Sequence, residues 1–316
     1  MPPVTGLLDA VQMVDGPDLS AIASIAQLAR HDPVEDPGAF WCAAARAAES
    51  VPEALGGPLP DGRRLLRGLP SDRELPDTPR DSRRPPGRHV LLSEFWLSVF
   101  GLLLGTPVAF RGQQASALHQ NVGPIPGSEH EESDVGSVRP LPLHSENPFH
   151  ELAPDYVLLA CLRSDRAATA GTTLARVADL VGRLDGEVVA TLRRPIFVER
   201  GAAKATLPAP VVTGPSHDPL ATFDASWTTS ASAEGIAAVQ ALARELPSVT
   251  GVMHLKPGDL LLIDNRRWLH GRTPFDASSG SRDRWLQRLY VCEGSERLDA
   301  LVERGDVVRA PVGVSA

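Results

Sequence analysis

Two histidines and one carboxylate carry the most informative chemistry in this chain of 316 residues. His144 and Glu146 are two positions apart in LPLHSENPFH, and His270 follows the apolar run DLLLI. Alternate side chains of a strand share a face, so His144 and Glu146 can converge on one ion. With His270 they would form a two-histidine, one-carboxylate triad. Such a triad leaves adjacent coordination positions open, as oxygen-activating ferrous iron requires.

Two arginines downstream strengthen this interpretation. A histidine-x-glutamate pair occurs by chance, and a single histidine is more often a hydrogen-bonded loop or core residue. Arg284 and Arg288, however, follow His270 at short offsets in DRWLQRLYV. On a strand both even-numbered positions point the same way. An arginine fork of this kind suits a dicarboxylate cosubstrate.

The elements that must position these residues are mainly strands. From about residue 105, short apolar runs are broken by Gly and Pro, as in a β-sandwich or barrel. Residues 119–140 are polar and acidic, which fits either a mobile flap or a plain solvated loop. The sequence also predicts helices within four stretches, at residues 18–48, 89–104, 172–184 and 232–249.

The N-terminal part has a different texture. Residues 57–88 are rich in Pro, Arg, Asp and Gly without a hydrophobic period, and they predict a long surface connection or a partly disordered segment. We therefore expect a helical elaboration with this connection over 1–88. A core over 89–316 would follow, with a helical insert at about 232–249.

Composition limits the partners and the compartment. The net charge of −8 argues against a nucleic-acid-binding face, which needs a basic excess. The N-terminus does not have the pattern of a signal peptide, and the most apolar stretch, 95–110, is shorter than the ~20 residues that span a bilayer. Cys42, Cys161 and Cys292 are widely spaced, which favours a reducing, cytoplasmic setting without disulfides. The oligomeric state is not readable.

Three stretches together resemble a known family. HSENPFHELAPDYVLLACLRSD, GDLLLIDNRRWLHGRTPF and DRWLQRLYV are similar to the clavaminate synthase-like branch of the Fe(II)/2-oxoglutarate-dependent oxygenases, within the taurine dioxygenase superfamily. The resemblance covers roughly residues 90–295. It implies a mainly β fold with flanking helices, a distorted double-stranded β-helix (a cupin-like jelly roll). It also implies Fe(II), 2-oxoglutarate and O₂ as cofactor and cosubstrates.

The resemblance implies a role for particular residues. His144, Glu146 and His270 would ligate iron, and Arg284 would hold the distal carboxylate of 2-oxoglutarate. Thr173 falls where the family places a threonine that helps to bind 2-oxoglutarate, with Thr172 a near-equal candidate and a helix N-cap as the structural alternative. The substrate would be an amino acid. Arg288 would bind its α-carboxylate, with a surface strand residue as the structural alternative. Gln120 and Glu146 would contact its α-amino group.

The expected reaction is hydroxylation of an unactivated C–H bond of a free L-amino acid in specialised metabolism such as antibiotic biosynthesis. A carboxylate is present at Glu146, where halogenating members of the superfamily lack one. Asp224 lies where the family often places an acidic residue that reads the side chain, which would suit a basic substrate such as lysine, arginine or a derivative. An Asx-turn ahead of a helix is the alternative for Asp224.

Other functions fit the same residues less well. The same fold could act as a desaturase or cyclase, or on an amino acid tethered to a carrier protein. A metal-binding jelly-roll protein without enzymatic activity would leave Arg284 and Arg288 without a role. A zinc hydrolase usually has helical His-Glu-x-x-His spacing, which is absent here.

Overall fold

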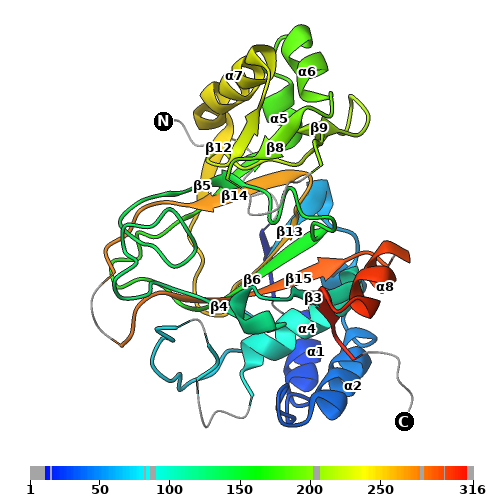
Figure 1. Cartoon of the computed structure of the whole chain (residues 1–316). Coiled ribbons are helices and arrows are strands. Elements are labelled where there is room, and N and C mark those ends of the chain that lie inside the picture. The colour runs from blue at the N-terminus through cyan, green and yellow to red at the C-terminus, as the bar shows by residue number, and fades with distance from the viewer. Residues whose placement is uncertain are drawn as a thin grey trace.

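Two facing β-sheets form the centre of the computed structural model, which describes residues 11–14, 16–81, 83–85, 90–201, 207–277, 281–294 and 296–311 (Figure 1). The larger sheet has eight strands in the order β1-β2-β13-β6-β15-β3-β16, with β4 also paired to β15. Its strands are β1 (Val11–Met13), β2 (Arg63–Arg67), β3 (Thr106–Phe110), β4 (Gln120–Val122), β6 (Tyr156–Arg163), β13 (Leu260–Asp264), β15 (Trp285–Cys292) and β16 (Val307–Arg309).

The smaller sheet has four strands in the order β12-β7-β14-β5. These are β5 (Leu141–His144), β7 (Thr172–Arg176), β12 (Thr250–Met253) and β14 (Trp268–Arg272). Two short ribbons accompany it, formed by β8 (Phe197–Glu199) with β11 (Thr228–Ser230) and by β9 (Val212–Thr213) with β10 (Leu220–Ala221).

Helices cover the outer face of each sheet (Figure 1). Those outside the larger sheet include α1 (Gly16–Ala26), α2 (Pro37–Ala48) and α4 (Leu92–Leu104), and those outside the smaller sheet are α5 (Val177–Val181), α6 (Gly186–Leu192) and α7 (Ala233–Val249). Two further helices are α3 (Glu53–Gly56) and α8 (Glu296–Glu303), and two 3₁₀ turns are η1 (Pro60–Gly62) and η2 (Gln114–Ser116). Helix α7 starts at Ser232, whose hydroxyl accepts from the Gly235 N–H at 3.0 Å.

The interior between the sheets is apolar away from the site. Leu174 of β7 and Trp268 of β14 pack with Leu159 of β6 and Leu286 of β15 in one buried cluster. Because side chains alternate along a strand, the opposite faces of the same strands face the helices. Leu289 of β15 packs in the cluster that contains α2 and α4.

Strand β2 lies within the stretch that the sequence predicts as a connection. Leu65 and Leu66 are both buried, because β2 is paired on one side with β1 and on the other with β13. Three of its five residues are arginines, so the strand has no continuous hydrophobic pattern in the sequence. Each of these arginines contacts another group of the protein. Arg67, for example, pairs with Asp259 at 2.7 Å. The larger sheet therefore crosses the boundary expected at residue 88.

The helix predicted over 172–184 is also corrected. Its first five residues form strand β7, which is paired with β12 and β14 on both sides, and only Val177–Val181 is helical as α5. Two β-branched threonines begin this stretch, and pairing on both sides outweighs its helical periodicity. Among the described residues, no helix is long and apolar enough to cross a membrane.

Candidate active site

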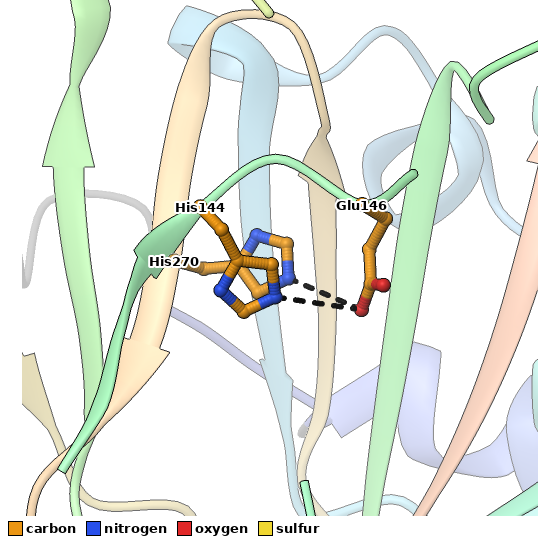
Figure 2. Close-up of side chains that lie close together, drawn as sticks. All are labelled: His144, Glu146 and His270. Carbon is orange, nitrogen blue, oxygen red and sulfur yellow. Dashed lines mark hydrogen bonds and ion pairs between the residues drawn. The ribbon is translucent and has the colours of Figure 1, made fainter. Parts of the chain in front are cut away.

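His144, Glu146 and His270 converge at the edge of the smaller sheet (Figure 2). His144 is the last residue of β5, and it is the register partner of His270 on β14. One potential ligand atom from each of the three residues lies within 4.8 Å of the others. The Oε1 of Glu146 is 3.5 Å from the Nε2 of His270 and 4.0 Å from the Nε2 of His144. The three predicted metal ligands are therefore brought together.

Backbone contacts hold Glu146 and His144 in these positions. The turn between β13 and β14 contains Asn265, whose Oδ1 accepts from the Glu146 N–H at 2.7 Å and whose amide donates to the Glu146 carbonyl at 3.2 Å. The Nδ1 of His144 lies 2.8 Å from the carbonyl oxygen of Pro142, so this nitrogen donates and Nε2 is left as the acceptor. Fixing one ring nitrogen in this way is common for histidines that bind metals.

The ionisation of these groups suits a divalent metal. Burial by itself would raise the pKa of Glu146, but the charge of Arg288 and the two imidazoles bring it well below its ordinary range. Burial also lowers the pKa of His270, so its ring is neutral near neutral pH. An ionised carboxylate with neutral imidazoles is the donor set that ferrous iron takes in this arrangement. A ferrous ion fits these residues.

A single pocket joins the metal-binding triad to Arg288 of β15 and to Arg284, which immediately precedes this strand. Its polar lining comes from both sheets and from the loop before β5, and consists of Asp134, His144, Glu146, Thr172, His270, Arg272, Arg284 and Arg288. The prediction that Arg284 and Arg288 point the same way is confirmed, since both line this pocket with Leu286 between them.

Arg284 is buried with an exposed fraction of 6%. Within the described part of the chain, no carboxylate lies within ion-pair distance of its guanidinium, and the Phe275 ring is 5.8 Å away. Burial lowers the pKa of Arg284 below its ordinary value. A buried cation without a counter-ion is costly, so this position calls for an anionic ligand such as the distal carboxylate of 2-oxoglutarate.

Arg288, in contrast, has three protein partners. Its Nη1 donates to the Oε1 of Glu146 at 2.7 Å, its Nε to the Oε1 of Gln120 at 2.9 Å, and its Nη2 to the Oδ2 of Asp134 at 3.2 Å. Burial opposes its charge, but these carboxylates raise the pKa of Arg288 above its ordinary value. The Nε2 of Gln120 is buried and has no hydrogen-bond partner among the described residues. Gln120 can therefore still contact a ligand.

The structure reverses the expected order of the two threonines. Thr172 is the register partner of Arg272 and lines the pocket, whereas Thr173 pairs with Gly271 and its side chain is on the other face of β7. Because Thr173 lies within a strand, it is not the helix N-cap considered from sequence. Thr172 is the threonine available to a ligand.

Asp224 lies beside the metal site through its backbone. It forms an isolated β-bridge with His144, while its Oδ1 accepts from the N–H groups of Ser226 at 2.7 Å and Trp227 at 3.0 Å. This is the Asx-turn geometry. Asp224 is not among the residues that line the pocket. Its second carboxylate oxygen is not used in these turn contacts.

Two pocket residues, Asp134 and Arg272, and one residue that contacts Glu146, Tyr290, were missed from sequence. Tyr290 donates from its hydroxyl to the Oε2 of Glu146 at 2.7 Å, and Arg272 donates to the backbone carbonyls of Ser137 and Arg139, both at 3.2 Å. Strand parity could have found both, because Tyr290 is two residues after Arg288 and Arg272 two after His270. Asp134 comes from the acidic loop, where no periodic signal exists. Together Asp134 and Arg272 fasten that loop over the pocket.

Comparison with family models and known proteins agrees with this geometry. Residues 191–290 match the model described as taurine catabolism dioxygenase TauD, TfdA family. The chain is 36% identical to L-asparagine oxygenase of Streptomyces coelicolor over 77% of this chain and 74% of the relative. It is 32% identical to clavaminate synthase 2 of Streptomyces clavuligerus, over 82% and 85% of the two chains.

Two further matches extend the comparison. L-lysine 3-hydroxylase of Catenulispora acidiphila is 31% identical, over 84% of this chain and 77% of that protein. A crystal structure of asparagine oxygenase with Fe(II), a hydroxyasparagine and succinate superimposes with a TM-score of 0.82 at 33% identity. That superposition covers 90% of this chain and 93% of the other.

Proposed function

The chain belongs to the TauD/TfdA family of iron- and 2-oxoglutarate-dependent oxygenases, and on that premise we propose that it hydroxylates a free L-amino acid with a basic side chain. The observation that carries this proposal is one pocket that joins a two-histidine, one-glutamate triad to Arg284, which has no carboxylate partner in the described part of the chain, and to Arg288 beside the amide of Gln120. Iron, 2-oxoglutarate and an amino acid each have a matching part of that pocket.

We further propose that the two sheets are the halves of a distorted double-stranded β-helix, the jelly roll expected from the resemblance. Facing sheets of eight and four strands with helices on their outer faces support this architecture. Every residue proposed to contact iron, 2-oxoglutarate or the amino acid lies between 120 and 290. That range falls within the core expected over 89–316.

Each cofactor and substrate group is assigned to residues of this chain. His144, Glu146 and His270 would hold the iron. Arg284 would bind the distal carboxylate of 2-oxoglutarate, with Thr172 rather than Thr173 beside it. Arg288 would bind the α-carboxylate of the amino acid, while the outer oxygen of Glu146 and the Oε1 of Gln120, which also accepts from Arg288, would accept from its α-amino group. The Nε2 of Gln120 is a donor and would contact an oxygen atom of a ligand.

Iron and 2-oxoglutarate together supply the oxidising chemistry that inserts one oxygen atom of O₂ into a C–H bond, while 2-oxoglutarate becomes succinate and CO₂. The residues of the chain would position the two organic molecules and keep water away from the metal site. Arg288 of β15 and Arg284 immediately before it would orient both organic molecules against the triad, and such positioning supplies much of the rate. The loop fastened by Arg272 and Asp134 limits the access of water.

A basic substrate is supported by the carboxylates near the pocket and by the similarity of the chain to relatives such as L-lysine 3-hydroxylase. Asp134 lines the pocket, and Asp224 lies beside His144 with one carboxylate oxygen outside its turn. We propose that Asp224 reads the cationic side chain. Asparagine is the alternative substrate, because an asparagine oxygenase is 36% identical to this chain.

The test is a mass-spectrometric screen of the purified protein with Fe(II), ascorbate, 2-oxoglutarate and each free amino acid, including ornithine, citrulline and enduracididine. Gain of one oxygen atom by lysine, arginine or a derivative, with matching succinate, would support the proposal. Product only from asparagine, proline or leucine would refute the basic side chain. Absence of product from every free amino acid would refute hydroxylation of a free substrate, and desaturated or cyclised products would appear in the same spectra.

We also propose a cytoplasmic location, which free cysteines support. Cys161 and Cys292 are buried free thiols, and burial raises the pKa of each to about 12. Such thiols are structural rather than reactive.

A further inference from the structure

Thr78 lies in the proline- and arginine-rich stretch that the sequence predicts as a mere connection. Its exposed fraction is 5%, and its hydrogen bonds reach the segment just before Arg284. The Thr78 N–H donates to the carbonyl of Ser281 at 2.8 Å, and its hydroxyl donates to the carbonyl of Asp283 at 2.6 Å. One residue therefore holds the backbone on both sides of position 282.

We propose that Thr78 is a positioning residue for Arg284 and thereby sets the affinity for 2-oxoglutarate. This inference rests on the proposed role of Arg284. Arg284 stands immediately before β15, and no described carboxylate fixes its guanidinium. The direction of its side chain must therefore come from its backbone, which Thr78 fastens.

Two neighbours make the Thr78 contact specific. Arg163, at the end of β6, donates from Nη1 to the Thr78 hydroxyl at 2.6 Å and from Nη2 to the carbonyl of Pro76 at 3.1 Å. The hydroxyl of Thr78 thus both donates and accepts. On the other side, a Cβ at Gly123 would come within 2.8 Å of the Arg284 carbonyl and 3.2 Å of the Thr78 methyl group. The glycine lets Thr78 and Arg284 approach each other.

The second arginine of the pocket has no such dependence. Arg288 lies in the middle of β15, paired with Gln120 of β4 and Leu159 of β6. Its guanidinium is fixed by Glu146, Gln120 and Asp134. Loss of the Thr78 hydroxyl should therefore weaken 2-oxoglutarate binding and leave amino-acid binding unchanged. A general structural defect would weaken both.

The test compares Thr78→Val, which keeps the shape and removes the hydroxyl, with Thr78→Ser, which keeps the hydroxyl. Anaerobic calorimetry of the Fe(II)-loaded protein would give the Kd of 2-oxoglutarate, and hydrogen exchange of residues 281–286 in the metal-free protein would report on the backbone directly. We expect Thr78→Val to raise that Kd about tenfold, as for a lost buried hydrogen bond, and to speed exchange. Thr78→Ser should stay within about twofold of wild type.

Thr191→Val is the matched control, because this buried hydroxyl also makes two hydrogen bonds, to Glu187 and Glu234, but lies in α6 away from the pocket. An unchanged Kd for Thr78→Val would overturn the inference, as would an equal rise in the amino-acid KM. If Thr78→Val does not fold, Arg163→Met removes the hydrogen bond that the Thr78 hydroxyl accepts and the contact that holds Pro76, so Thr78 loses its support and a selective loss of 2-oxoglutarate binding must follow. Retention of 2-oxoglutarate binding by Arg284→Ala would instead refute the proposed role of Arg284, independently of the result for Thr78.

Discussion

Tyr290→Phe tests whether the carboxylate of Glu146 is tuned for metal binding by a single hydroxyl. The Tyr290 hydroxyl donates to the Oε2 of Glu146 at 2.7 Å, and both side chains are buried. Burial and the neighbouring carboxylate raise the pKa of Tyr290 well above its ordinary value, so it remains a donor throughout the usable pH range. The substitution removes one oxygen atom and keeps the ring that packs against Phe110.

The size of the effect follows from what the hydroxyl contacts. A hydrogen bond to a charged group contributes about 1.5–3 kcal/mol, and the Oε2 of Glu146 would be left buried without this donor. Losing the partner of a metal ligand typically costs about 10- to 100-fold in metal affinity or activity. We therefore expect the Fe(II) concentration for half-maximal activity to rise by that factor, with a smaller loss of kcat at saturating iron.

The measurement is a titration of activity against free Fe(II), checked by competition with a chelator. Tyr156→Phe is a matched control, because Tyr156 is the other tyrosine of the chain and its hydroxyl bonds to Glu293 at 3.1 Å, away from the metal site. An Fe(II) titration of Tyr290→Phe that overlays the wild-type curve would show that the hydroxyl does not tune Glu146. An equal shift in both variants would attribute the effect to general destabilisation.

Four other outcomes are expected. His270→Ala should abolish decarboxylation of 2-oxoglutarate, because two remaining ligands hold iron poorly; full turnover would exclude the triad. Arg288→Lys should raise the KM for the amino acid at least about tenfold while the 2-oxoglutarate KM stays constant, since the guanidinium fork is lost. Asp224→Asn should raise the KM for a basic substrate, and an unchanged KM would remove Asp224 as side-chain reader. His119 is half-buried and stacks on Trp41, and the loss of hydration lowers its pKa below its ordinary value. The neutral ring therefore stabilises the fold above about pH 6.5, and this stability falls by up to ~1.4 kcal/mol per unit as the pH drops. Urea unfolding at pH 7.5 and 5.5 should show a smaller decrease for His119→Gln than for the wild type, and equal decreases would contradict this.

The two histidines and the two arginines could be predicted from sequence because their pattern follows strand geometry, whereas Glu146 lies two residues beyond the end of β5 and is held there by Asn265 rather than by strand pairing. His144, His270, Arg284 and Arg288 all lie on, or immediately before, strands, where parity fixes which side chains share a face. The same rule would have separated Thr172 from Thr173, had 172–176 been recognised as a strand. Its helical periodicity concealed the pairing with strands that are distant in sequence.

Contacts made by irregular segments could not be predicted in this way. Asp134 reaches Arg288 from a loop, and Thr78 reaches Asp283 across 205 residues of sequence. Neither contact is marked by a periodic pattern in the sequence, because each depends on the path of a loop across the folded sheets. Strand β2 was missed for another reason, since its arginines are satisfied by carbonyl oxygens, an aromatic ring and Asp259 rather than by solvent.

The division of the site between the two sheets has a consequence for how this enzyme can change. The histidines stand on the smaller sheet, and the arginines stand on the larger one. The spacing between metal and arginines is therefore set by the apolar side chains that separate the sheets, among them Leu159, Leu174 and Leu286. Leu159 and Leu286 also line the pocket, so their volume limits the length of a molecule that would fit between the metal ligands and the guanidinium groups. A change of substrate length could thus arise from the volume of a core residue that carries no polar group.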